Sequence, residues 1–167
     1  MKNCLEFAEI LGTITQEQKE AKKTVERYFE ERTAAKQEEM KKRSTTLAAF
    51  MPEEIKKMSF SQLLDTFMDE GRMRRARGIS NREVNMREIS DNRVTATVRE
   101  YNVVFDLQKR TILHDCADWS RCIPAKQFCK HIGKVLLTLP QGKATSILRQ
   151  VSLEREKWDF KPYATEA

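Results

Sequence analysis

The chain has 167 residues, of which 40% are apolar and 34% are charged, with five glycines and four prolines. That length suffices for one domain, or one small domain with an extension, and the composition argues against disorder throughout. There is no apolar run of about 18 residues, and Glu6 and Glu9 interrupt the apolar stretch that a signal peptide would need. We therefore expect an intracellular protein with reduced cysteines and no membrane partner, in the cytoplasm or associated with a nucleoid or nucleus.

The net charge of +6 is unevenly distributed along the chain. Residues 1–70 hold 12 Lys and Arg against 14 Asp and Glu, whereas residues 71–167 hold 19 against 11. A basic segment favours phosphate-rich partners, because its charges displace the counterions of nucleic acid. A surface that binds nucleic acid is therefore expected in the second half of the chain.

Residues 1–71 are predicted to form a helical extension. Residues 5–11 suggest a short helix, and residues 15–18 have the form of a capping box that would open a long charged helix at about 16–45. Its apolar stripe is thin and consists of Ala21, Val25, Tyr28, Phe29, Ala35 and Met40. A solvated helix lying against the domain and an arm that docks on a protein both fit this pattern. Apolar residues 47–50 are a second candidate for docking.

Two short helices are expected at about 52–70. Pro52 suits the first turn of one, because proline lacks the amide that would be unpaired there. Ser59 and Gln62 form a second capping box, followed by Leu63, Leu64, Phe67 and Met68 on one side. Gly71 is predicted to end this helix.

After Gly71 the pattern changes from helical spacing to alternation. Four strands of an antiparallel meander are predicted at residues 82–89, 93–99, 101–107 and 111–116, the second from strict alternation in RVTATVR. Helix 130–139 follows, with apolar residues at 132, 135, 136 and 139, and a closing helix is expected at 143–157. The predicted fold class is α+β: N-terminal helices, a small β-meander joined to a helix as in a ββα finger, and a C-terminal helix.

Both histidines and three of the four cysteines lie in HDCADWSRCIPAKQFCKH, residues 114–131. Residues i and i+2 of a strand point to the same side, so His114 and Cys116 could reach one point, and Cys129 and His131 could close on it from the next helix. Two sulfurs and two nitrogens suit one tetrahedral Zn²⁺, and four protein ligands leave no open position. We therefore predict a structural zinc site.

The same residues resemble the SWIM zinc finger, whose pattern is Cys-x-Cys, a spacer, and then Cys-x-His. Asp118-Trp119 is similar to the acidic–aromatic pair of that family, and CKHI at 129–132 resembles its second ligand pair. The resemblance covers residues 72–140, which implies a zinc-binding domain there between extension 1–71 and a C-terminal helix and tail at 141–167. The family has cysteine as its first ligand, so Cys122 is an alternative to His114, although strand geometry favours His114.

The resemblance implies binding to DNA or to proteins, in recombination, repair or chromatin. The candidate nucleic-acid-binding residues are Arg72, Arg74, Arg75, Arg77, Lys126, Lys130 and Lys134. We expect a nucleic-acid partner, with DNA favoured over RNA. Docking of the N-terminal helices on an ATPase or another large assembly is one alternative, and association with RNA or the ribosome is another. Trp119 is expected to pack against the zinc loop.

We do not expect an enzyme or a small-molecule substrate. The chain has no third histidine for a catalytic triad and no glycine-rich phosphate loop.

Overall fold

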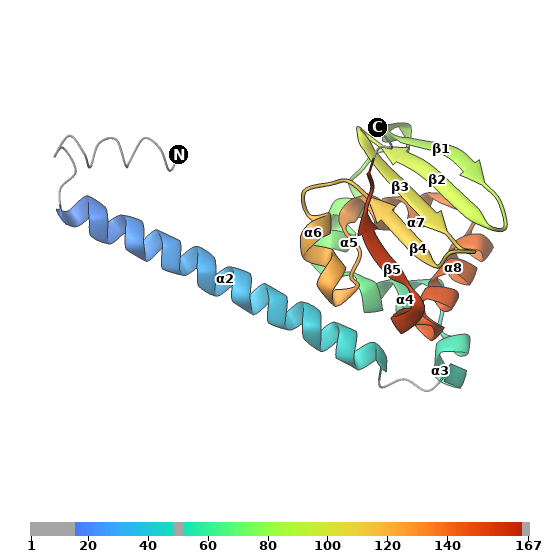
Figure 1. The fold of residues 1–167 in the computed structure, drawn as a ribbon, viewed down its shortest axis with the longest axis horizontal. Helices are drawn as coiled ribbons and strands as arrows, with labels where there is room; N and C mark the ends of the chain where they lie inside the picture. Colours follow the sequence, from blue (N-terminus) through green and yellow to red (C-terminus); the bar gives the residue numbers. More distant parts are fainter. Residues whose placement is uncertain (1–15, 49–51, 165–167) are drawn as a thin grey trace. The chain divides into compact units, whose positions relative to one another are not determined.

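The computed structural model describes residues 16–48 and 52–164, and within α2 it describes the side chains of residues 18–35 and 38. The chain forms two compact units, Met1–Glu39 and Met40–Ala167. Most of helix α2 (Gln16–Ala48) belongs to the first unit, and the other described helices and strands belong to the second. The architecture is α+β, as predicted (Figure 1). Of the described helices, none is both long and apolar enough to cross a membrane.

Helix α2 agrees with the long charged helix predicted at about 16–45. Its described side chains, those of residues 18–35 and 38, are exposed or half-exposed, and Val25, Tyr28 and Phe29 are 53%, 53% and 62% exposed. Three predicted features lie outside the described residues: the helix at 5–11, Thr15 of the capping box, and the side chains of residues 47–50. An isolated helix is marginal in water unless it packs on something, so these apolar side chains are candidates for contact with a partner.

Three short helices follow, α3 (Pro52–Lys57), α4 (Phe60–Phe67) and α5 (Glu70–Arg77). The capping box of α4 is confirmed, because Ser59 Oγ accepts from the Gln62 amide and Gln62 Oε1 accepts from the Ser59 amide. The prediction that Gly71 ends a helix is wrong. The carboxylate of Asp69 accepts from the Arg72 amide at 2.7 Å and starts α5, so Gly71 lies in its first turn.

The sheet has five strands in the order β1 (Val84–Ile89), β2 (Arg93–Val98), β3 (Tyr101–Asp106), β4 (Thr111–His114) and β5 (Asp159–Pro162). The first four pair antiparallel, which confirms the predicted meander. Val94, Ala96 and Val98 of β2 are all buried, as their alternation predicted. The fifth strand was not predicted, and it pairs parallel to β4, so the sheet is mixed.

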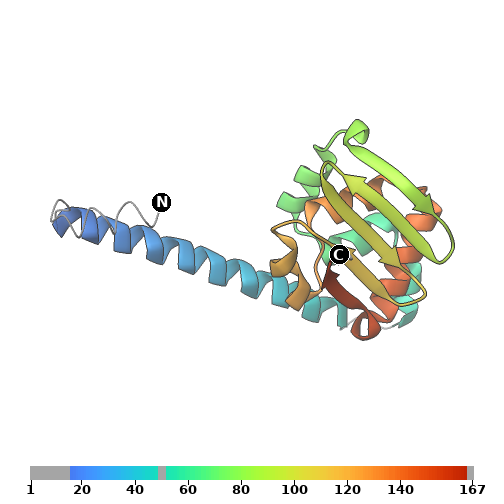
Figure 2. The ribbon, with the colours of Figure 1, turned by 45° about the horizontal axis from the view of Figure 1, so that its top comes forward.

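Helices α5 and α7 (Lys130–Thr138) lie on one face of the sheet (Figures 1 and 2). Helix α7 packs on the sheet and α5 packs on α7, while α8 (Gln141–Leu153) packs on α3 and α4. The predicted core residues at positions 132, 135 and 136 of α7, and Leu139 at its C-cap, are all buried. A Cβ atom at Gly133 would overlap Met68 Sδ, so a larger residue there would require the Met68 side chain to move. The N-terminal end of α7, with Cys129 and His131, is buried in the core.

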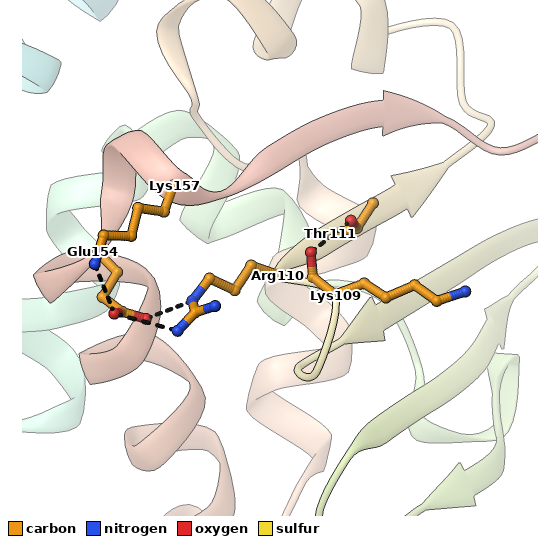
Figure 3. Close-up of polar contacts among 5 residues, drawn as sticks. All are labelled: Lys109, Arg110, Thr111, Glu154 and Lys157. Atoms are coloured by element: carbon orange, nitrogen blue, oxygen red, sulfur yellow. Dashed lines mark hydrogen bonds and ion pairs between the residues drawn. The ribbon is translucent and has the colours of Figure 1, made fainter.

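The turn between β3 and β4 connects the sheet to the end of α8 (Figure 3). Arg110, which has a φ of 51°, donates from Nε to Glu154 at 2.7 Å, and Lys157 donates to the same carboxylate at 3.3 Å. The Asp159 amide donates to the Arg110 carbonyl oxygen at 2.8 Å. These contacts bring the chain after α8 alongside β4, where it forms β5.

Candidate metal centre

Four buried side chains converge where β4 ends and α7 begins. His114 is the last residue of β4, Cys116 lies two residues later, Cys129 is the N-cap of α7, and His131 lies in its first turn. One ligand atom from each, a ring nitrogen or Sγ, lies within 4.8 Å of the others. We call His114, Cys116, Cys129 and His131 the quartet. It is the set of residues that the sequence predicted as metal ligands.

The chain brings the first pair of the quartet together differently from the prediction. The predicted strand 111–116 ends at His114, so Cys116 does not share a strand face with it. The strand ends there because the Asp115 carboxylate, rather than a backbone carbonyl, accepts from the Asn102 amide at 2.8 Å. The chain then turns, and the Trp119 amide donates to the Cys116 carbonyl oxygen at 2.9 Å. Cys116 reaches the histidine through this turn instead of through strand alternation.

The ring nitrogens of the quartet fit a metal ion. Nε2 of His114 and both ring nitrogens of His131 are buried and have no hydrogen-bond partner among the described residues. Buried polar atoms without a partner are rare and call for an explanation. In a tetrahedral zinc site the ligand atoms are about 3.3–3.8 Å apart, so small side-chain movements would close the quartet around one ion. The quartet could therefore hold one metal ion, with no ligand position left for water.

The two thiols of the quartet differ in their acidity. The neighbouring Cys129 thiol lowers the pKa of Cys116, and the nearby imidazoles of His114 and His131 lower it further, against the effect of burial. Burial raises the pKa of Cys129 well above its usual value, and the hydrogen bond between its thiol and Cys116 raises that pKa further. A cation bound by the quartet would displace the proton of the less acidic thiol, because both sulfurs bind metal as thiolates.

Aromatic rings surround the quartet. The half-buried ring of Tyr101 stacks on His131 at 4.6 Å and meets His114 edge-on at 6.2 Å. Trp119 is buried, meets His114 edge-on at 5.8 Å, and stacks on Phe160 at 5.4 Å. The packing expected for Trp119 is therefore confirmed, while the contact of Tyr101 was missed. Its position at the start of the third predicted strand, two residues from the pairing partner of His114, was the available signal.

Cys122 is buried at the end of α6 (Trp119–Cys122) but does not belong to the quartet. The four residues whose ligand atoms lie within 4.8 Å of one another include His114 and not Cys122.

The predicted nucleic-acid-binding residues are divided between surface and interior. Arg74, Arg75 and Arg77 on α5 are exposed, and Lys130 is half-buried. Arg72, by contrast, is buried and forms an ion pair with Asp69 at 3.4 Å. That residue is therefore not available to a phosphate, because the capping turn of α5 places it against the core.

Two lysines near the quartet also have internal partners. Lys134 is 6% exposed and donates to Asn81 Oδ1 at 2.6 Å. Lys126 donates to the carbonyl oxygens of Arg155 and Glu156 at 2.7 and 3.2 Å. The expectation of a basic surface through Lys134 is corrected, since its alkyl chain is packed between α7 and the turn before β1.

Comparisons with models of protein families, with curated proteins and with solved structures found no match for this chain.

Proposed function

We propose that the protein is a zinc-binding, SWIM-type, nucleic-acid-binding module directed at DNA. The observation that supports zinc is the donor set of the quartet, because two thiolates and two imidazoles in a closed tetrahedral shell favour zinc over harder cations. The zinc would be structural and would join β4 to α7. The proposal includes no catalytic step. The resemblance of residues 114–131 to the SWIM pattern supports a link to repair or recombination.

Three exposed arginines support the nucleic-acid part of the proposal. Arg74, Arg75 and Arg77 lie on α5, which packs against α7, the helix that carries His131 in its first turn. A zinc ion that fixes the start of α7 would therefore also fix the helix that presents these charges. Clustered guanidinium groups bind phosphates bidentately and displace counterions.

Fluorescence anisotropy of the full chain with labelled duplex DNA, single-stranded DNA and RNA tests this proposal. We expect DNA binding whose affinity falls steeply between about 50 and 200 mM salt. Reversing Arg74, Arg75 and Arg77 to Glu should weaken it by at least about tenfold and reduce the salt slope by roughly one per lost phosphate contact. Tighter binding to RNA than to DNA would favour the RNA alternative.

A matched control reverses Lys56, Lys57 and Lys109 to Glu, since all three are exposed and the net charge changes by the same amount. We expect this variant to lose much less affinity than the α5 variant. Equal losses in the two variants would show that total charge, and not the α5 arginines, determines binding. Failure of the wild-type protein to bind any of the three nucleic acids would overturn the proposal.

A protein partner for α2 is a second candidate, favoured by the exposure of its apolar side chains. Val25, Tyr28 and Phe29 lie at i, i+3 and i+4 on one side of the helix, where helix-in-groove partners find their anchors. Co-purification of the full chain and of a variant without residues 1–39 tests this candidate. A partner that both forms retain equally would not bind residues 16–39 of α2.

A further inference from the structure

The two histidines of the quartet are held in different ways. Nδ1 of His114 lies 2.5 Å from the backbone carbonyl oxygen of Asn102. A carbonyl oxygen only accepts, so Nδ1 must carry the proton, and in the neutral ring Nε2 is then the free lone pair. Among the described residues, neither ring nitrogen of His131 has a hydrogen-bond partner. The tautomer of His114 is therefore fixed by the protein, whereas no comparable bond fixes His131.

Asn102, whose carbonyl fixes this tautomer, is itself held by a single carboxylate. Asp115 Oδ1 accepts from the Asn102 amide and Oδ2 accepts from Asn102 Nδ2, both at 2.8 Å. The regular pairing of β3 with β4 ends one residue earlier, at Val103 and His114. The Asp115 side chain thus takes the place of the next backbone rung and holds both the main chain and the side chain of Asn102.

We propose that Asp115 is a positioning residue of the metal centre. Through its two hydrogen bonds it fixes Asn102, and the Asn102 carbonyl orients His114 so that Nε2 faces the other ligands. This inference rests on the proposed binding of a metal by the quartet. Outer partners of ligating histidines fix the ring and raise its basicity, and their loss costs roughly 10- to 100-fold in metal affinity.

The position of Asp115 separates this role from a contribution to the core. Its side chain is 28% exposed, and its carboxylate lies 3.8 Å from His114 Nδ1 as an additional electrostatic contact. Asp115 is an exposed residue, so its removal should not open a large cavity. Substitution should therefore change metal affinity more than it changes folding in the presence of excess metal.

The experiment measures Zn²⁺ affinity of the full chain by competition with a chelator, and records the absorption of the Co²⁺-loaded protein. We expect Asp115→Ala to bind Zn²⁺ roughly 10- to 100-fold more weakly than wild type and to change the Co²⁺ spectrum. Asp115→Asn keeps one acceptor for the Asn102 amide and should lose less. Asp118→Asn is the matched control, because this exposed carboxylate lies in the same loop and makes no capping hydrogen bond.

A second measurement needs no variant. In the wild-type chain loaded with ¹¹³Cd²⁺, nuclear magnetic resonance should show coupling from the metal to Nε2 of His114, with Nδ1 protonated. Coupling to Nδ1, or equal affinities of wild type and Asp115→Ala, would overturn the role of Asp115 while leaving metal binding intact. If the wild-type chain binds neither Zn²⁺ nor Co²⁺, both this inference and the proposed zinc site fail.

Discussion

Helix α2 and residues 114–131 are both rich in side chains that could bind something, but they differ in where those side chains lie. In α2 the described side chains are exposed or half-exposed, including Val25 and Phe29. In residues 114–131 the histidines and cysteines are all buried, and aromatic rings contact both histidines. The two segments therefore differ in the burial of these side chains.

The difference has an energetic consequence. The ligands of the quartet follow a buried strand and open a buried helix, so a metal ion bound there joins two parts of the core. The charged side chains of α2 form pairs such as Arg27 with Glu31 at 3.9 Å, which contribute little to stability because both groups are exposed. Changes at the quartet should therefore affect folding, while changes on α2 should affect only binding.

The largest effect is expected from removing a ligand of the quartet. Cys129→Ala should abolish tight Zn²⁺ binding and with it the metal-dependent stability, which amounts to about 4 kcal/mol when free zinc exceeds its dissociation constant by about 1,000-fold. Urea unfolding of both proteins, with added zinc and with a chelator, measures this difference.

The control for this experiment is Cys122→Ala, another buried cysteine in the same segment that lies outside the quartet. It should keep full zinc binding, while His114→Ala should lose it. The opposite result, with zinc retained in His114→Ala and lost in Cys122→Ala, would assign the fourth ligand to Cys122.

The next largest effect is expected from removing the side chain of a buried phenylalanine in residues 114–131. Phe128 is fully buried and stacks on Phe67 at 4.5 Å and on Phe160 at 5.8 Å. Phe128→Ala should therefore cost about 3–5 kcal/mol of unfolding free energy, because it removes a large side chain from a packed site. Urea titration at saturating zinc measures the loss separately from metal binding. A loss below about 1 kcal/mol would mean that this segment is not the packed part of the core.

The pH dependence of metal binding should be smaller. Burial and the hydrogen bond to Cys116 raise the pKa of Cys129. Zinc must therefore displace a proton from the Cys129 thiol when it binds. A proton released on binding makes affinity rise with pH, by up to about tenfold per pH unit while that thiol stays protonated. Chelator competition between about pH 7 and pH 9 gives the slope. A flat profile would show that both thiols are already ionised in the metal-free protein.

Local patterns explain which features could be predicted from the sequence. The apolar spacing of α7, the alternation of β2 and the capping box of Ser59 each depend on residues a few positions apart. The quartet was predictable because one residue separates the two ligands of each pair, although Cys116 reaches the quartet through a turn and not, as predicted, through strand alternation. Such features survive folding because tertiary contacts reinforce them.

The remaining features depend on contacts between distant residues. Strand β5 has four residues and is held by pairing with β4, about 48 residues earlier in the chain, and by contacts such as that of Arg110 with Glu154. The burial of Lys134 depends on Asn81, and the end of β4 depends on the bond between Asp115 and Asn102. Side-chain contacts of this kind leave no periodic trace, so composition could suggest a basic surface without showing which members face solvent.

The smallest effect on stability is expected from replacing a phenylalanine by alanine on α2. Phe29 is 62% exposed, so Phe29→Ala should change the unfolding free energy by no more than about 0.5 kcal/mol. The matched pair Phe128→Ala and Phe29→Ala thus makes one chemical change in a buried and in an exposed segment. If α2 docks on a protein, Phe29→Ala should reduce co-purification of that protein while the urea midpoint stays unchanged. A marked loss of stability instead would show that Phe29 packs within the chain in solution, and α2 would then belong with the core rather than with the binding surfaces.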